Sequence, residues 1–227
     1  MTEVKIAAIV EGHGECEAVP LLIRRIASII DPGFVPTVLP PMRVPASRLR
    51  KQGEMERFVT LASRKLQGRG GILVLIDCDW QDGCPAHDGP ALLERAKQAR
   101  SDYPISVVLA KKEYEAWFLA AAVSLRGKRG LPANIDAPSD PEDIRDAKRW
   151  LAEKMPRGTS YSETADQAAF TAIFDMEVAR RADSFDKCFR DISKMLRELK
   201  EDANAWTCPD QASLKPGDMQ ADGEPTH

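Results

Sequence analysis

Residues 71–80 have the sequence GILVLIDCDW, an apolar run that ends in two acids. Strands buried on both faces read as continuous apolar runs, which is typical of parallel sheets in α/β proteins. Such folds hold their ligands at the carboxyl ends of strands. We therefore expect a central strand over residues 71–77, followed by Asp77 and Asp79 at the edge where chemistry takes place. If extended geometry continues past the strand, both side chains point to the same side, about 6–7 Å apart.

A second apolar run, VKIAAIV at residues 4–10, also ends in an acid, Glu11. The glycines of the following EGHGE segment allow a tight turn, and residues 15–30 then show apolar side chains at helical spacing. The segment has neither the lysine of a Walker motif nor a GxGxxG pattern, which argues against a nucleotide-binding loop. An acid after a strand is also a common turn or helix-cap residue, so one acidic pair alone indicates little.

The rest of the first half continues the alternation of strands and helices. We expect a proline-interrupted edge strand near 35–39, helices at 54–67 and 90–101, and a further strand at 105–110. This order predicts a Rossmann-like α/β core with a four-stranded, mainly parallel sheet in which the edge strand lies outside the first strand. The strands at 4–10 and 71–77 then lie side by side, and Glu11, Asp77 and Asp79 meet at a topological switch point.

The second half is predicted to be helical. Residues 116–123 are apolar nearly all round, and helices are expected at 140–155, 163–180 and 184–200. From residue 203 the chain is acidic and contains three prolines, which predicts a disordered tail. The predicted domains are therefore a core at 1–123, a helical appendage packing on it at 124–202, and a tail at 203–227.

Composition limits the possible functions. The formal charge is −3 over 227 residues, so binding of a polyanion such as nucleic acid would need a local basic patch. The five scattered cysteines, without a secretory segment, predict a cytoplasmic protein, and no apolar run is long enough to cross a membrane. Cys78, Cys84 and His87 lack the spacing of a zinc site.

The predicted meeting of Glu11, Asp77 and Asp79 indicates a metal site made only of oxygen ligands. Such a site suits Mg²⁺ or Mn²⁺, and a bound cation relieves the repulsion among the carboxylates. It can also neutralise phosphate charge and orient a water molecule.

Several segments together resemble a known group of proteins. A glutamate after the first strand and a DxD pair after the third are the signature of TOPRIM domains, found in topoisomerases, primases and some nucleases. The segments VEGHGE, LVLIDCD, KKEYEAWFLA, SYSETADQ and SFDKC further resemble an uncharacterised TOPRIM-related bacterial family, often encoded beside an AAA- or ABC-type ATPase and suspected in phage defence.

The resemblance implies roles for individual residues. Its candidate catalytic set is Glu11, Asp77, Asp79 and Glu115. Glu15 and Glu113 are implied as supports, and Tyr161, Asp166 and Gln167 as part of the rim of the site.

Some of these residues also have simpler explanations. Glu15 can serve the N-terminus of the following helix, where an acid is favoured by the helix dipole. Two residues apart on a helix, Glu113 and Glu115 cannot both face the site, and we select Glu115. Lys111 and Lys112 either bind phosphate or are solvated charges at a strand end, and we prefer the second interpretation. His13 is either a proton donor or incidental to the glycine turn, and again we prefer the second. Tyr161 is expected to pack in the core.

The sequence leaves two functions open. The first is a Mg²⁺-dependent phosphoryl-transfer enzyme, a TOPRIM-type nuclease acting with an ATPase partner on nucleic acid. In it Glu11 either binds the metal or acts as a general acid or base. The second is a non-catalytic TOPRIM-like module that binds an ATPase partner or a phosphorylated ligand.

Overall fold

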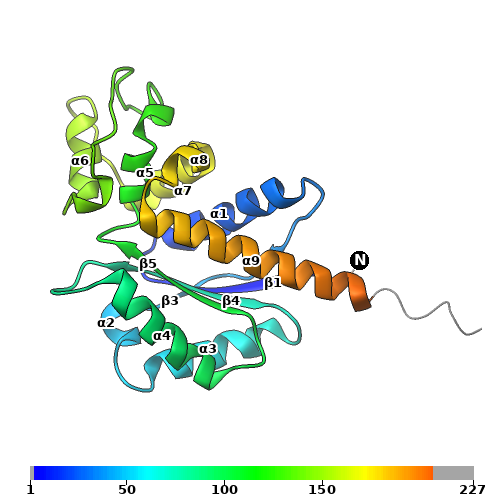
Figure 1. Cartoon of the computed structure of the whole chain (residues 1–227). Coiled ribbons are helices and arrows are strands. Elements are labelled where there is room, and N and C mark those ends of the chain that lie inside the picture. Colours follow the sequence, from blue (N-terminus) through cyan, green and yellow to red (C-terminus); the bar gives the residue numbers. More distant parts are fainter. Residues whose placement is uncertain (1–2, 207–227) are drawn as a thin grey trace, which may run out of the picture.

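A parallel β-sheet lies between two layers of helices in the computed structural model, which describes residues 3–206 (Figure 1). Its strands are β1 (Lys5–Val10), β2 (Thr37–Val38), β3 (Met42–Arg43), β4 (Gly71–Cys78) and β5 (Ile105–Lys111). Their order is β2-β1-β4-β5, and β3 also pairs with β1. The predicted α/β class and the predicted neighbours of the first strand are confirmed, although the sheet has five strands where four were expected.

The additional strand arises because the edge strand is divided in two. β2 pairs with the first half of β1, where Lys5 lies opposite Thr37, and β3 pairs with the second half, where Ile9 lies opposite Met42. Pro40 and Pro41 stand between the two pieces. Proline has no amide N–H to donate to a ladder, so the pairing is interrupted there.

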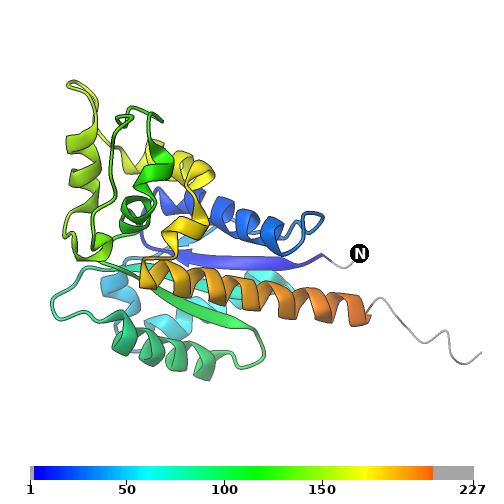
Figure 2. The same cartoon turned by 45° about the horizontal axis from the view of Figure 1, so that its top comes forward.

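Helices cover both faces of the sheet (Figure 2). One face carries α2 (Ala46–Leu49), α3 (Glu54–Leu66) and α4 (Pro85–Ala99), and the other carries α1 (Glu15–Ile30) and α9 (Asp183–Trp206). Successive residues of β4 alternate between the two cores: Leu73 and Leu75 pack toward α1, whereas Val74 and Ile76 pack toward α3. The unbroken apolar run therefore reflects burial on both faces.

A group of shorter helices lies over the carboxyl end of the sheet, above α1 (Figure 1). It consists of α5 (Ala116–Ala120), the 3-10 helices η1 (Ala122–Leu125) and η2 (Pro141–Asp143), α6 (Ala147–Lys154), α7 (Glu163–Ile173) and α8 (Met176–Ala179). Every side chain of α5 is buried, and the rings of Trp117 and Phe118 contact Phe185, Phe170 and Phe174. The helical region thus shares one apolar core with the face of the sheet that α1 covers.

The helix predicted at 140–155 is instead two short elements. η2 ends at Asp143, and α6 begins only at Ala147. The Glu142 carboxylate accepts the amide N–H groups of Asp183 (3.1 Å) and Ser184 (3.0 Å), so it caps α9 and holds its own segment there. Asp146 then caps α6 by accepting the Arg149 amide at 2.9 Å. The first contact ties η2 to the start of α9, and the second begins α6 anew at Ala147, so the segment does not continue as one helix.

The helix predicted at 163–180 is also divided. α7 ends at Ile173, and Phe174 adopts an extended conformation that buries its ring. Asp175 then accepts the amides of Glu177 and Val178 and starts α8. Burial of Phe174 and the new cap together account for the break.

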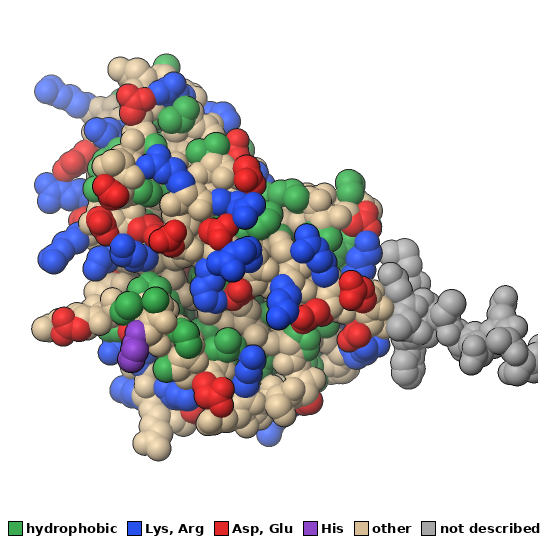
Figure 3. Space-filling model, viewed as in Figure 1, with side chains coloured by type: hydrophobic (Ala, Val, Ile, Leu, Met, Phe, Trp, Pro, Cys, Tyr) green, Lys and Arg blue, Asp and Glu red, His purple; other side chains and the backbone are tan. Residues whose placement is uncertain are grey.

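Helix α9 covers β5, the strand at one edge of the sheet. Lys111 N–H donates to the Ser184 hydroxyl (3.2 Å), and the Lys187 ammonium donates to the Val107 carbonyl (3.3 Å). Acidic and basic side chains are intermixed on this side of the molecule (Figure 3). α9 continues to Trp206, four residues into the tail predicted from residue 203, and the rest of that predicted tail lies outside the described residues. No helix in the described part is long and apolar enough to cross a membrane.

Candidate acidic functional site

Glu11 connects the ends of two neighbouring strands. Its Oε2 accepts the amide N–H of Asp77 at 3.3 Å, and its Oε1 accepts the amide of Ala46, the first residue of α2, at 3.0 Å. Burial raises the pKa of this half-buried carboxyl, and the charge of Asp79 adds to the effect, whereas the two amides oppose it. The acids that follow β1 and β4 are therefore adjacent, as the strand order predicted.

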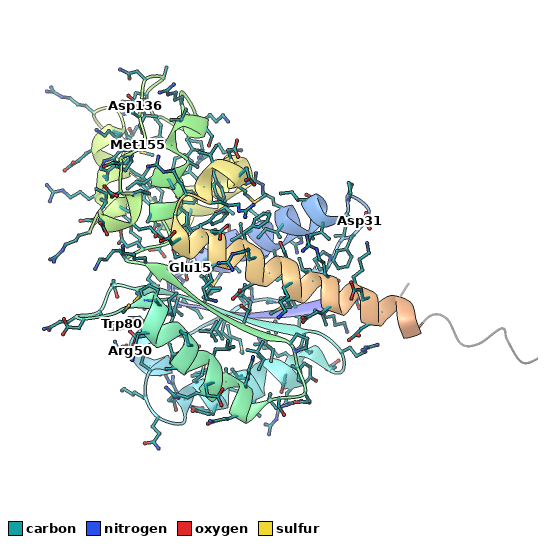
Figure 4. The ribbon with its side chains drawn as sticks, viewed as in Figure 1. Glu15, Asp31, Arg50, Trp80, Asp136 and Met155 are labelled. Carbon is teal, nitrogen blue, oxygen red and sulfur yellow. The ribbon has the colours of Figure 1, made fainter. Side chains whose placement is uncertain are left out.

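Glu15 stabilises the glycine turn after β1. Its Oε2 accepts the amides of Glu11 and Gly12, both at 2.7 Å, and the side chain is buried (Figure 4). Burial raises the pKa of Glu15 to about 7, and the nearby charges of Glu115 and Glu11 add to that rise. These contacts give Glu15 a structural role in the turn before α1, which differs from the expected role at the N-terminus of that helix.

The glycines of the turn allow helix α7 to approach closely. A Cβ on Gly14 would lie 2.4 Å from the Gln167 Oε1 and 2.5 Å from the Glu163 carbonyl oxygen. The Gly14 amide donates to the Glu163 carboxylate at 3.3 Å. The glycine-rich sequence is thus explained by packing of the turn against α7.

Asp77 and Asp79 have different surroundings. The Oδ1 of Asp77 accepts the Tyr114 amide at 2.8 Å, and its Oδ2 lies 3.8 Å from the Lys148 Nζ. Burial raises the pKa of Asp77 well above its usual value, with further increases from the charges of Glu15 and Glu115. Asp79 is exposed beyond the end of β4, and its carboxylate accepts no hydrogen bond from residues 3–206. Of the two, Asp79 is the one that is open to solvent.

Glu113 and Glu115 both face the site, so the expectation that only one of them would do so was wrong. The chain turns before α5, with Lys112 at a left-handed φ of 69°, and the helical geometry assumed for the pair does not apply. Glu113 accepts the Ala147 amide at 2.7 Å, which caps α6. Glu115 is fully buried and accepts the Tyr161 hydroxyl at 2.7 Å and the Gln167 Nε2 at 3.1 Å.

Lys148 of α6 lies among these carboxylates, and the sequence did not identify it. Its Nζ is 3.2 Å from Glu113 Oε1, 3.2 Å from Glu115 Oε2 and 3.8 Å from Asp77 Oδ2. Burial lowers the pKa of Lys148, but the three carboxylates outweigh burial and raise it overall. No sequence pattern links Lys148 to the acids. Its segment was expected to be part of one long helix at 140–155, which gave no reason to place Lys148 at the ends of the strands.

The residues implied as a rim have distinct roles. Tyr161 does more than pack: it donates to Glu115, and its ring stacks on Phe170. Asp166 forms an ion pair with Arg129 at 2.9 Å and accepts the Ser162 amide at 2.9 Å. Two buried oxygens, Gln167 Oε1 and Glu115 Oε2, have no hydrogen-bond partner in the described part of the chain. The Lys148 ammonium lies 3.2 Å from Glu115 Oε2, but the two groups are not aligned for a hydrogen bond. Burial raises the pKa of Glu115, opposed by Lys148.

The larger hollows of the surface lie away from this cluster. A groove of about 430 Å³ runs between α4, β5 and α9, and it includes Lys111, which forms an ion pair with Asp143 at 2.8 Å. A hollow of about 360 Å³ lies farther along α9. His13 is exposed. We therefore define the site by its charges and hydrogen bonds.

The oxygen atoms of the acidic side chains are the type of ligand that a hard divalent cation binds. Glu11, Asp77 and Asp79 offer only oxygen, and each carboxylate oxygen has two lone pairs, so those that accept one amide can still bind a cation. Among residues 3–206, however, no three histidine, cysteine or acidic side chains converge as a preformed metal site. Binding by all three would therefore require their carboxylates to come closer together than they are.

Residues 10–193 match the family model described as a domain of unknown function, DUF4276. The match spans most of the chain, which therefore belongs to this family. Searches of curated proteins and of solved structures found no significant match.

Proposed function

We propose that this protein is a Mg²⁺- or Mn²⁺-dependent phosphoryl-transfer enzyme, a TOPRIM-type nuclease that hydrolyses phosphodiester bonds. The observation that carries the proposal is the hydrogen bond from the Asp77 amide to the Glu11 carboxylate, which joins the acidic ends of two adjacent parallel strands. The order of a glutamate after the first strand and a DxD pair after a central strand supports it. The same resemblance supports an AAA- or ABC-type ATPase as partner and a role in phage defence.

The residues that would hold the cation are Glu11, Asp77 and Asp79. A bound Mg²⁺ would neutralise phosphate charge and lower the pKa of a water molecule. Glu11 is half-buried and burial raises its pKa, which favours a role as general acid or base over that of a fully solvated carboxylate. Glu15 holds the backbone of Glu11, and the Tyr114 amide orients Asp77.

A second candidate, a non-catalytic module that binds an ATPase partner or a phosphorylated ligand, is favoured by Lys148. This lysine already provides a cation for Glu113, Glu115 and Asp77. Part of the acidic cluster is therefore neutralised by the chain itself. If Lys148 takes the place of a metal ion in this way, the protein keeps the TOPRIM-like fold but does not hydrolyse phosphodiester bonds.

Calorimetric titration with Mn²⁺ and a nuclease assay test the proposal. The wild type is compared with Asp77→Asn, Glu11→Gln and the control Asp102→Asn, which changes an acid paired with Arg100 outside the acidic cluster. We expect Asp77→Asn to lose metal affinity because a charged ligand is removed. Glu11→Gln separates the two roles open to Glu11. If Glu11 is chiefly a proton-transfer group, metal binding survives and hydrolysis falls by about 10²–10⁴-fold, the usual scale for such groups. If Glu11 is a ligand, metal affinity falls as well.

The assay uses DNA and RNA, with and without the ATPase partner. Wild-type protein that binds no Mn²⁺ at millimolar concentration, with or without nucleic acid, would contradict the enzymatic proposal. Metal binding that appears only in Lys148→Met, without hydrolysis in any protein, would favour the non-catalytic module.

A further inference from the structure

Trp80 and Arg50 form a stacked pair next to the acidic site. Trp80 directly follows Asp79 and is half-buried, and the Arg50 guanidinium carbon lies 4.3 Å from the centroid of its ring. Figure 4 shows the two labelled side chains close together at the end of the sheet that also carries the acids. Arg50 itself is exposed, so the outer face of its guanidinium is open to solvent.

This pair differs from the other contacts between arginine and aromatic rings in the described chain. Arg48 and Arg57, which contact Phe58, form ion pairs with Glu54. The remaining ones are also anchored: Arg100 by Asp102, Arg180 by Asp186, and Arg25 by two backbone carbonyls. Among residues 3–206, only Arg50 combines a ring contact with a guanidinium that has neither a carboxylate nor a carbonyl acceptor.

The backbone that carries Arg50 is nevertheless held firmly. Arg95 donates to the Arg50 carbonyl at 3.1 Å and to the Lys51 carbonyl at 2.7 Å, and it is itself paired with Glu56. Arg50 ends helix α2, whose first amide donates to Glu11. The free guanidinium is thus attached to the same short helix that the acidic site holds in place.

Trp80 is equally well positioned. The Gly83 amide donates to the Trp80 carbonyl at 3.1 Å, and a Cβ on Gly83 would lie 2.8 Å from the indole nitrogen, so the loop packs closely on the ring. A hollow of about 200 Å³ beside the pair is lined by both side chains and by Asp88, Ala91, Leu92 and Arg95. An exposed, unpaired guanidinium on a fixed aromatic ring is a flat cationic platform.

We propose that the Arg50–Trp80 pair stacks a base of single-stranded nucleic acid and so places the adjoining phosphate near Asp79, the exposed acid that directly precedes Trp80. The inference rests on the proposed function, since it names the substrate class of that site. Bases stack on aromatic rings and on guanidinium planes without regard to sequence, and the guanidinium N–H groups also pair with phosphate. A base inside a duplex is already stacked on its neighbours, which is why the platform selects single strands.

Binding of short fluorescent DNA and RNA oligonucleotides, measured by anisotropy in EDTA, tests the platform without hydrolysis. We expect Trp80→Leu to weaken single-strand binding about tenfold, within the range for loss of one stacked base, and Trp80→Phe to weaken it less. Arg50→Gln should weaken binding and lower the salt dependence by about one phosphate contact. The control Arg48→Gln removes an arginine–aromatic contact that is already neutralised by Glu54, and it should leave binding unchanged.

Three results would overturn the inference: wild-type protein that binds no single strand, Trp80→Leu that binds within twofold of wild type, or duplex bound as tightly as single strand. Thermal melting establishes whether Trp80→Leu is folded. If it is not folded, quenching of tryptophan fluorescence by the oligonucleotide provides the test. We expect quenching in the wild type and less quenching in Trp80→Phe. Equal quenching in the two proteins would count against the platform.

The two proposals fail in different ways. Binding that depends on Trp80, in a protein that takes up no Mn²⁺ and hydrolyses nothing, leaves the platform in place and removes the enzyme. Hydrolysis with an unchanged KM in Trp80→Leu and Arg50→Gln removes the platform and leaves the enzyme.

Discussion

The acidic cluster, which consists of Glu11, Asp77, Asp79, Glu113 and Glu115, has two sides whose charges are compensated differently. On the side of β5, Glu113 and Glu115 are compensated by Lys148, Tyr161 and Gln167. On the side of β1 and β4, Glu11 receives only backbone amides, and Asp79 is exposed. Asp77 belongs to both, because its amide donates to Glu11 whereas its carboxylate faces the Tyr114 amide and Lys148.

This difference separates acids whose charge is compensated within the protein from an acid whose charge can interact with a ligand. A buried carboxylate is tolerated only when a counter-charge or hydrogen-bond donors offset its lost hydration. The β5 side meets that requirement within the chain, whereas the charge at Asp79 is free to meet a ligand. We therefore expect substitutions on the β5 side to change stability, and substitutions of Asp79 to change ligand binding.

The largest effect on stability is expected from Lys148→Met. Removing the ammonium leaves Glu113, Glu115 and Asp77 without their shared cation, and breaking a buried pair from one side costs about 3 kcal/mol or more. Urea unfolding at pH 7.5 measures the loss, with Lys148→Arg as the control that keeps the charge. A loss below about 1 kcal/mol would show that solvent, and not Lys148, compensates these acids.

A second prediction concerns the pH dependence of stability through Glu15. Its pKa rises from 4.5 to about 7 on folding, so the folded state binds the proton more tightly. The stabilisation from Glu15 is complete below pH 4.5 and is lost as pH rises to about 7. Glu15→Gln should remove up to about 3 kcal/mol of this pH dependence, at about 1.4 kcal/mol per pKa unit. Equal slopes for the two proteins between pH 4.5 and 7 would contradict the assignment.

A smaller effect is expected from Tyr161→Phe, which removes the hydroxyl that donates to buried Glu115 and keeps the ring on Phe170. Loss of a hydrogen bond to a charged group costs about 1.5–3 kcal/mol. Urea unfolding gives the value, and Tyr103→Phe is the control because its hydroxyl donates to a carbonyl near the surface. If both variants lose the same stability, the hydrogen bond from Tyr161 to buried Glu115 contributes no more than one at the surface.

The smallest effect on stability is expected from Asp79→Asn. The side chain is exposed, so the melting temperature of the metal-free protein should change by less than about 2 °C. Mn²⁺ affinity should nevertheless fall, because a charged ligand is lost. Thermal melting and calorimetric titration of the same preparation test both statements. A large fall in melting temperature would place Asp79 with the structural acids and remove the contrast between the two sides.

The order of the central strands and the contact between Glu11 and Asp77 could be predicted from the amino-acid sequence alone, although the division of the edge strand into β2 and β3 could not. Both results follow from local patterns: an apolar run marks a strand buried on two faces, prolines confine a strand to the edge, and an acid directly after a strand lies at its carboxyl end. The side-by-side pairing of β1 and β4 then leaves little freedom for the positions of these acids.

The compensation of the remaining charges depends on contacts between segments that are far apart in the sequence. Glu113 caps a helix that starts 34 residues later, and Glu142 caps one that starts about 42 residues later. Lys148 and the raised pKa of Glu15 depend in the same way on groups brought together by packing. Such contacts leave no periodic signal, because they are selected by the shape and charge of distant surfaces and not by the spacing of neighbouring residues.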